Sequence, residues 1–309
     1  MAYDTRLRLL SHSSRQLLHE CPRKYQLYRL TPPLREFDQH TDFGSTLGVG
    51  IQEYLTSGSK QAAIWKMFCE FQGDLYEDGE KAKKTFLHAV FAIDLFSQIR
   101  ATILLDYEVA TFHGKPAIEL GFRVSVGDAG FLYRGFVDVV LVSRTTGKLL
   151  VLELKTTGMT AQEANYANSG QGLGYSIFTK EIAPSVEEFD VLYLVFETKA
   201  AQFVPMMFTK YHTERALWIQ DLIADCQIIS VYENFEVWPR HGESCFSFFK
   251  PCHWFGMCHM SNKALIPPPP KEGTNPEAEI VDTKKPKEVY DFELHLADLM
   301  QTQQEALEA

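Results

Sequence analysis

Two stretches near the middle of the chain, Gly135-Phe136-Val137-Asp138 and Val151-Leu152-Glu153-Leu154-Lys155-Thr156-Thr157, decide how this sequence is interpreted. Both are apolar segments of the kind that form strands, and both carry charges where charges are normally excluded. Residues two apart on a strand point to the same face, so Glu153 and Lys155 project together while the intervening leucines face a core. Burying two carboxylates without a counter-charge costs several kcal/mol each. Because Lys155 neutralises only one of them, the pattern predicts a cation beside Asp138 and Glu153.

The residues around these strands extend the pattern. Asp138 lies fifteen positions before Glu153, and the turn signal Thr145-Thr146-Gly147 between them suits two adjacent antiparallel strands. Glu119 lies on the preceding strand-like segment and could bring another carboxylate to the same end. A Glu-x-Lys pair by itself is weak evidence, since charged residues alternate on many solvated strand faces. The prediction therefore depends on the whole set.

The periodicity of the apolar residues predicts a layered domain of helices and strands. Helices are expected over 43–72, 81–111, 161–180 and 213–229, and strands over 117–126, 131–142, 149–156, 189–197 and 203–209. Four consecutive prolines from Pro267 begin a stiff linker over residues 264–288. Residues 289–309 are an acidic tail in which an amphipathic helix is expected, suited to docking on a partner protein. A disordered solubilising tail is the alternative.

Length and composition fit a globular protein. The 309 residues can bury a substantial core, and contents of 45% hydrophobic and 23% charged residues are ordinary for such a protein. No apolar stretch approaches the ~20 residues that span a bilayer, and the N-terminus lacks the apolar core of a secretory signal. We therefore expect a cytoplasmic protein without a membrane partner.

The net charge of −10 argues at first sight against a nucleic-acid partner. Its distribution weakens that objection, because residues 264–309 hold ten acidic residues against four lysines. The rest of the chain is nearer neutrality and can still present a basic groove.

Taken together, these motifs resemble the PD-(D/E)XK nuclease superfamily, specifically its RecB-like exonuclease branch, which includes phage-type enzymes. The Gly-x-x-Asp and Glu-x-Lys-Thr-Thr core matches, as do the Gln-x-x-x-Tyr at residues 171–175 and the opening Cys21-Pro22-Arg23-Lys24-Tyr25. The resemblance implies an α/β fold with a restriction-endonuclease-like core, in which helices flank a central mixed β-sheet and an N-terminal helical region precedes it. It implies one nuclease domain over residues 1–263, with a helical part at about 40–112, a catalytic core at about 113–235 and a cysteine segment at 245–258.

The resemblance also assigns chemistry to the matching positions. Asp138 and Glu153, with Glu119 as a further candidate, would bind Mg²⁺ or Mn²⁺, which prefers oxygen ligands and lowers the pKa of bound water. Lys155 would position or activate the attacking water.

The same resemblance implies contacts with DNA. Gln171 and Tyr175 are expected as catalytic residues that touch DNA near the site, and Ser169 beside them is expected to bind DNA. Arg23 and Lys24 are candidates for contact with the nucleic-acid backbone, although each can equally be a helix-surface residue that packs on the cysteine segment.

One position departs from the family pattern. Many relatives carry a metal-binding histidine at the position that aligns with Gly48. His40, Gln52 or Glu53 could compensate, or the metal has fewer protein ligands. Alternatively, the glycines of this stretch allow a helix to pack closely.

Three cysteines lie in a short segment broken by a proline and a glycine, which suggests a loop wrapped around a metal: Cys245, Cys252 and Cys258. In the RecB-like branch an N-terminal cysteine, here matched by Cys21, joins three C-terminal ones to hold a [4Fe–4S] cluster, although the spacing here is wider than usual. Zinc, with His253 or His259 as further ligands, is the alternative, and unligated thiols are a third.

The expected activity is metal-dependent hydrolysis of phosphodiester bonds in DNA by an exonuclease of phage or bacterial recombination and repair. A phage-encoded enzyme would work in the cytoplasm of the bacterial host. The alternatives are a catalytically silent DNA-binding or scaffold subunit of the same fold and a structure-specific endonuclease.

Overall fold

The structure is a computed structural model that describes residues 4–32, 38–73, 84–126, 130–182, 188–247, 250–259 and 289–292. Packing within the chain divides it into two compact units, each built from segments that are distant in the sequence. Unit 1 comprises Met1–Arg35, Gly121–Gly135 and Ala216–Ala309, and unit 2 comprises Glu36–Leu120 and Phe136–Arg215.

Unit 2 contains most of the helices and strands that the structure describes. Its elements are α3 (Gln39–Ser57), α4 (Lys60–Glu70), α5 (Phe86–Ala101), β2 (Tyr107–Val109), β3 (Thr111–Phe112), β4 (Lys115–Pro116), β7 (Leu149–Thr157), α6 (Ala164–Ala167), α7 (Gly170–Ile182), β8 (Phe189–Glu197) and β9 (Gln202–Lys210). Two strands, β5 (Ile118–Val126) and β6 (Phe131–Ser143), belong in part to each unit.

The strands of unit 2 form a mixed sheet in the order β2, β6, β7, β8, β9. The pair β7 and β8 is parallel, whereas the other neighbouring pairs are antiparallel. A parallel pair needs a crossover connection, which α6 and α7 provide here. All nine residues of β8 are buried, as expected for a central strand that is covered on both faces. The predicted α/β fold with a mixed sheet and flanking helices is thereby confirmed.

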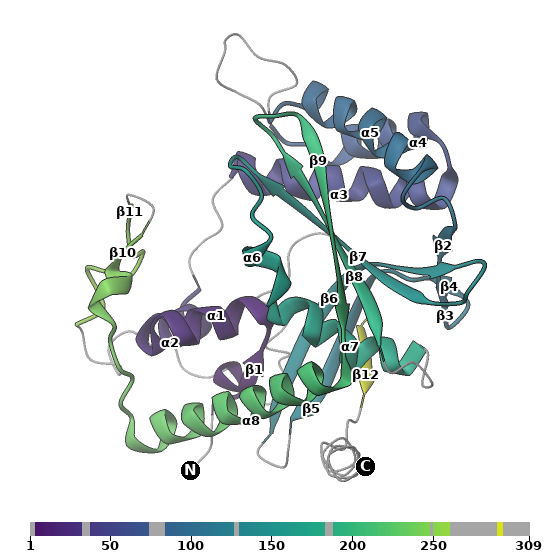
Figure 1. Cartoon of the computed structure of the whole chain (residues 1–309). Coiled ribbons are helices and arrows are strands. Elements are labelled where there is room, and N and C mark those ends of the chain that lie inside the picture. Colours follow the sequence, from purple (N-terminus) through teal and green to yellow (C-terminus); the bar gives the residue numbers. More distant parts are fainter. Residues whose placement is uncertain are drawn as a thin grey trace. The chain divides into compact units, whose positions relative to one another are not determined.

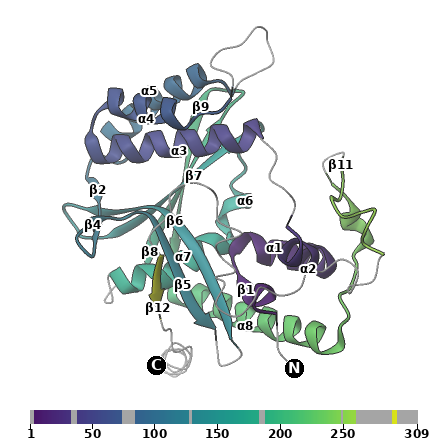
Figure 2. The same ribbon diagram turned by 180° about the vertical axis from the view of Figure 1, so that it is seen from behind.

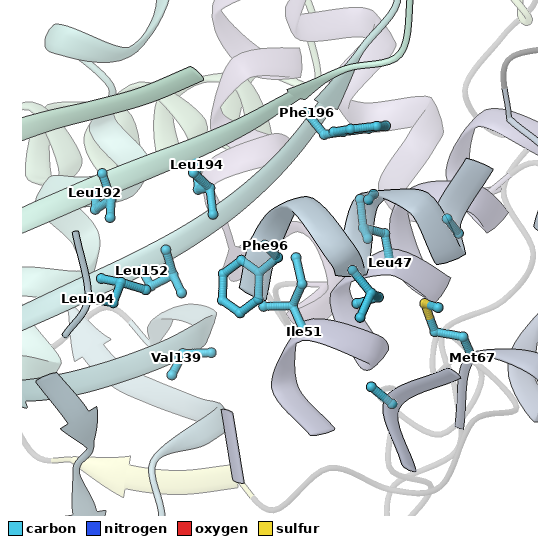
Figure 3. Packing of buried hydrophobic residues seen from close by; sticks show 14 of the residues in the cluster. Leu47, Ile51, Met67, Phe96, Leu104, Val139, Leu152, Leu192, Leu194 and Phe196 are labelled. Carbon is cyan, nitrogen blue, oxygen red and sulfur yellow. The ribbon is translucent and has the colours of Figure 1, made fainter. Parts of the chain in front are cut away.

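The core of unit 2 lies between the helices α3, α4 and α5 and the strands β6, β7 and β8 (Figure 1). Ile51 of α3 and Phe96 of α5 are fully buried and belong to one apolar cluster with Val139, Leu152 and Leu194 (Figure 3). Burial of such side chains contributes roughly 1.5–3 kcal/mol each. This cluster holds α3 against the sheet. In the view from behind, α3 lies across the strands near β7 (Figure 2).

Helix α3 has clear start and stop signals. The side chain of Asp38 accepts hydrogen bonds from the backbone N–H groups of His40 and Thr41, which caps the N-terminus. The helix ends at Gly58, whose φ of 67° is a left-handed conformation that glycine adopts at low cost.

Unit 1 combines both ends of the sequence. It contains η1 (Thr5–Arg8), β1 (Leu9–Leu10), α1 (His12–Glu20), α2 (Pro22–Leu30), most of α8 (His212–Phe235), η2 (Gly242–Cys245), β10 (Phe246–Ser247), β11 (Lys250–Pro251) and β12 (Val289–Phe292). Ion pairs join its first helices to α8: Arg8 lies 3.0 Å from Glu233, and Arg15 lies 2.5 Å from Asp225. Tyr25 of α2 stacks on Trp238 with ring centroids 6.0 Å apart.

Several predicted boundaries differ from the structure. The helix expected over 43–72 is two helices, because Gly58 ends the first. The helix expected over 81–111 ends at Ala101 and is followed by β2 and β3, and the helix expected over 161–180 is divided into α6 and α7. Short apolar runs do not distinguish a helix from a strand by periodicity alone.

The tail also begins differently from the prediction. Instead of starting a helix, Val289–Phe292 form β12, which pairs in parallel with residues 121–124 of β5. This four-residue segment contains valine, tyrosine and phenylalanine, which favour strands when a neighbouring strand is present. The predicted linker over 264–288 and the tail from 293 to 309 lie outside the described residues.

Candidate active site

Glu153 and Lys155 project from one face of β7, as the strand period requires. Nζ of Lys155 lies 2.7 Å from Oε1 of Glu153. Glu153 is 2% exposed, whereas the side chain of Lys155 is 35% exposed and reaches solvent. Burial by itself lowers the pKa of Lys155, but the charges of Glu153 and Asp138 outweigh it, so that its pKa is raised. Lys155 is therefore a cation at neutral pH.

Asp138 lies on β6 beside the Glu-x-Lys strand. The next residue, Val139, pairs with Leu152, and Oδ2 of Asp138 accepts a hydrogen bond of 3.0 Å from the backbone N–H of Leu154. Burial, and then the charge of Glu153, raise the pKa of Asp138 well above its ordinary value. Its other oxygen, Oδ1, accepts no hydrogen bond from any residue that the structure describes. A cation at this oxygen would relieve the repulsion between the two carboxylates.

Glu119 brings a further carboxylate near Asp138. It lies at the start of β5, and its charge also contributes to the raised pKa of Asp138. Its Oε1 accepts a hydrogen bond of 2.9 Å from Nε2 of Gln52, which comes from α3. Gln52 is one of three residues considered as a replacement for the missing histidine at position 48. Its side chain contacts the carboxylate of Glu119. His40 is exposed near the beginning of α3.

Gln171 and Tyr175 approach the same glutamate from α7. Nε2 of Gln171 donates to Oε1 of Glu153 at 2.8 Å, and the hydroxyl of Tyr175 donates to Oε2 at 2.8 Å. Oε1 of Gln171 accepts from Nζ of Lys155 at 2.9 Å. Both oxygens of Glu153 therefore have partners, and four predicted site residues form one network (Glu153, Lys155, Gln171 and Tyr175). Tyr175 is 3% exposed, so its hydroxyl holds Glu153 rather than facing solvent.

The predicted DNA-binding residues lie in different environments. Ser169 is half-buried beside the site, where its hydroxyl accepts from the backbone N–H of Gln171 at 3.3 Å. Arg23 of unit 1 is 2% exposed and donates to Gln26, so its burial gives no support to a contact with DNA. Lys24 is half-buried and lies 2.7 Å from Glu20 in the preceding helix.

Four cysteines lie around one pocket in unit 1. Cys21 precedes α2, and the three later cysteines come from the end of η2 and the segment that follows it. Together they line one pocket: Cys21, Cys245, Cys252 and Cys258. Burial raises the pKa of the Cys245 thiol, and the proximity of the other three sulfurs raises it further. Trp254 lines the same pocket and is 4% exposed.

The structure offers two sets of side chains with the chemistry of metal ligands. Across the described ranges, no three His, Cys, Asp or Glu side chains are arranged to hold a metal ion. The donor chemistry nevertheless fits two kinds of group. Half-buried and buried carboxylates that repel one another suit a hard divalent cation, and four thiols around one pocket suit a thiophilic metal.

Two residues, one beside the site and one that contacts a connection leading to it, were not found by sequence reasoning. Tyr193 of β8 pairs with Glu153 in register, and burial raises its pKa. Lys210 is 2% exposed, and its Nζ donates to the carbonyl of Ala167 at 2.5 Å, which anchors the connection between α6 and α7. An apolar strand with one tyrosine and a strand end with one lysine are too common to single out these positions.

An α/β core that displays an aspartate, a glutamate and a lysine on adjacent strands defines a class of phosphodiester-cleaving proteins. The chain belongs to the PD-(D/E)XK nuclease superfamily, which it matches over residues 9–259. No curated protein matches the sequence.

Solved structures give weaker likenesses. One is a candidate exonuclease from Eubacterium rectale, with 12% sequence identity, a TM-score of 0.47, and coverage of 77% of this chain and 86% of that chain. Another is the protein SSO0001, with 14% identity, a TM-score of 0.29, and coverage of 75% of this chain and 91% of that chain. No helix in the described parts of this chain combines the length and apolarity needed to cross a membrane.

Proposed function

We propose that this member of the superfamily is a Mg²⁺- or Mn²⁺-dependent deoxyribonuclease, and that it is an exonuclease of phage or bacterial DNA recombination or repair. The observation that carries the proposal is the arrangement of Glu153 and Lys155 on one face of β7 with Asp138 beside them on β6. A catalytically silent relative would have no need to keep three charged groups together in a largely buried site, since their burial is costly.

The carboxylates of Asp138, Glu153 and Glu119 are the groups that would hold the metal. Bound there, Mg²⁺ or Mn²⁺ would lower the pKa of water and balance the charge that develops on the phosphate. Oδ1 of Asp138 is open to such a ligand within the described structure, and the other oxygen is held in place by the N–H of Leu154. This hydrogen bond orients the carboxylate before any metal binds.

Lys155 contributes a fixed positive charge. Because its pKa is raised, it serves as a hydrogen-bond donor and not as a general base at neutral pH. With a third of its side chain exposed, it can orient the attacking water and stabilise the extra negative charge on the phosphate in the transition state.

The proposed cofactor of unit 1 is a [4Fe–4S] cluster on Cys21, Cys245, Cys252 and Cys258. The four thiols around one pocket support this proposal, as does the buried Trp254 that lines the same pocket. Zinc is the second candidate, because four thiolates around one pocket are also a zinc donor set.

The test of the activity uses end-labelled linear DNA, single- and double-stranded, with Mn²⁺ or Mg²⁺. Wild-type protein should release nucleotides from the ends, whereas Asp138→Ala and Glu153→Ala should not, while still binding DNA. Asp94→Ala is a matched control, since Asp94 is an exposed residue of α5 that pairs with Lys60 on the surface. Absence of cleavage by the wild type under all these conditions would favour a DNA-binding or scaffold role.

DNA substrates with and without free ends distinguish an exonuclease from a structure-specific endonuclease. An exonuclease should leave covalently closed circular DNA and end-blocked DNA intact, whereas a structure-specific endonuclease should cut closed circles or branched substrates. Cleavage of closed circles at the rate of linear DNA would contradict the proposed exonuclease.

A further inference from the structure

Glu119 has an unusual backbone conformation for its residue type. Its φ of 51° lies in the left-handed region, which costs a residue with a side chain roughly 1–2 kcal/mol. Its neighbours are fixed: Ala117 is fully buried and its carbonyl accepts from the backbone N–H of Val140 at 2.9 Å, and Leu120 is 4% exposed. A strained residue of this kind persists only where the surrounding structure determines it.

The side chain of Gln52 binds this strained residue. It is 8% exposed, and within the described structure its side chain makes one hydrogen bond, the 2.9 Å contact from Nε2 to Oε1 of Glu119. A buried amide donor is expensive to leave unpaired, so the bond holds both partners. The two residues are 67 positions apart in the sequence, and only the packing of α3 on the sheet joins them.

The face of α3 that carries Gln52 runs along the active site. Gly44, Gly48 and Gln52 follow at four-residue spacing and therefore share one helix face. At one end, a side chain at Gly44 would meet the Thr156 hydroxyl at 3.2 Å, one residue beyond Lys155; at the other end is the contact with Glu119. Apart from α3 itself, no atom of the described residues lies within 4 Å of the point where a side chain at Gly48 would begin, so the helix face is open at this position.

We propose that Gln52 is a positioning residue that holds Glu119 in place as the third carboxylate for the catalytic divalent metal. This inference rests on the proposed function. Three observations support it. The amide of Gln52 is buried and has Glu119 as its acceptor, and Glu119 has a strained backbone. The helix face that carries Gln52 is open at Gly48. Removing the amide should release Glu119 from its position without removing any metal ligand.

The test measures Mn²⁺ affinity of the full-length protein without DNA, by electron paramagnetic resonance of free Mn²⁺. Gln52→Met keeps the size of the side chain and removes the donor. Loss of a group that orients a ligand typically costs 10–100-fold in metal affinity, and we expect a loss in this range. Gln98→Leu on the exposed side of α5 is the matched control and should bind Mn²⁺ as the wild type does.

A double-mutant cycle separates positioning from general damage. Glu119→Gln should weaken Mn²⁺ binding, and Gln52→Met added to it should cause no further loss, because the amide acts through Glu119. Additive losses, or wild-type affinity in Gln52→Met, would overturn the proposal. If Gln52→Met does not fold, Gln52→Asn replaces it in the same cycle, since its amide is one methylene too short to reach Glu119.

The failure of this proposal is distinguishable from failure of the proposed function. If wild-type protein binds Mn²⁺ and loses it in Asp138→Ala, but Gln52→Met has no effect, then only the role of Gln52 is wrong. If wild-type protein binds no Mn²⁺, the metal-dependent activity itself is wrong.

Discussion

The hydroxyl of Tyr175 donates a hydrogen bond of 2.8 Å to Oε2 of Glu153, and the phenol ring is almost completely buried. Together with Gln171 and Lys155, this contact fixes the orientation of the glutamate from two sides. Burial, together with the nearby charges of Glu153 and Asp138, raises the pKa of Tyr175 well above its ordinary value, so the hydroxyl keeps its proton and remains a donor. The Gln-x-x-x-Tyr motif therefore has a role inside the protein before any DNA binds.

Removal of this hydroxyl should impair catalysis and not DNA binding. Tyr175→Phe leaves Oε2 of Glu153 without its buried donor, which costs about 1–3 kcal/mol of stability. We expect roughly 10–100-fold slower cleavage from the misplaced glutamate, with the dissociation constant for DNA unchanged. Single-turnover cleavage and DNA binding in Ca²⁺ measure the two effects. Tyr211→Phe, at an exposed tyrosine, is the control, and a large loss of DNA affinity in Tyr175→Phe would instead support direct contact with DNA.

The catalytic role of Lys155 should be independent of metal binding. Its Nζ shares Oε1 of Glu153 with any cation that this oxygen would hold, so Lys155→Met should bind Mn²⁺ at least as tightly as the wild type. The rate of cleavage should nevertheless fall by roughly 10²–10³-fold, because a fixed charge aimed at the transition state is lost. Calorimetry with Mn²⁺ and single-turnover rates give the two numbers. Loss of Mn²⁺ binding in this variant would show that the lysine builds the metal site itself.

Asp138 should make the metal-free protein less stable as the pH rises. In the folded state its pKa is raised, first by burial and then by Glu153, so the folded protein retains a proton that the unfolded chain releases. Stability therefore falls as the pH rises from the ordinary aspartate pKa through the raised one, and the penalty is complete above it.

Asp138→Asn removes this penalty. In EDTA we expect its melting temperature to exceed that of the wild type by at least ~2 °C at about pH 8, and to equal it at about pH 4. Mn²⁺ at about pH 8 should stabilise the wild type and not the variant. Thermal unfolding followed by circular dichroism is sufficient, and a variant that is less stable than the wild type at the higher pH would contradict the assigned direction.

If the cysteine pocket holds an iron–sulfur cluster, the protein should be coloured. Anaerobically purified wild-type protein should be brown and contain iron and sulfide, and Cys252→Ser should lose both. Cys226→Ser is the control, because Cys226 lies in α8 outside the pocket and burial raises the pKa of its thiol to about 12. Colourless wild-type protein with bound zinc would select the second metal, and protein with neither metal would leave the thiols unligated.

The parts of the site that follow local rules were predictable. Glu153 and Lys155 stand out because a period of two places both charges on one face of an apolar strand, and Asp138 follows from the short turn between the strands. The contact of Tyr175 with Glu153 depends instead on the crossover from β7 to β8, and that of Gln52 with Glu119 on how α3 packs. Such distances are set by tertiary packing, which no short sequence window contains.

The same contrast between local sequence signals and tertiary packing explains which elements of the fold were predicted. Strand β8 was predicted with its observed bounds, because the unbroken apolar and aromatic run from Val191 to Phe196 carries a strong local signal. The end of α5 at Ala101 was not predicted, since apolar residues continue beyond it into β2. The pairing of β12 with β5 joins residues more than 160 positions apart and has no local signal.

The most direct test of the account is a Mn²⁺ titration of DNA cleavage by wild-type protein and Glu153→Gln, with end-labelled linear duplex as the substrate. Glu153→Gln keeps the size of the side chain and its place beside Tyr175 and Gln171, and removes the charge. Wild-type protein should cleave the duplex in a saturable, metal-dependent way, and Glu153→Gln should not cleave it at any Mn²⁺ concentration. Equal cleavage by both proteins, or cleavage by the wild type in EDTA, would contradict the account.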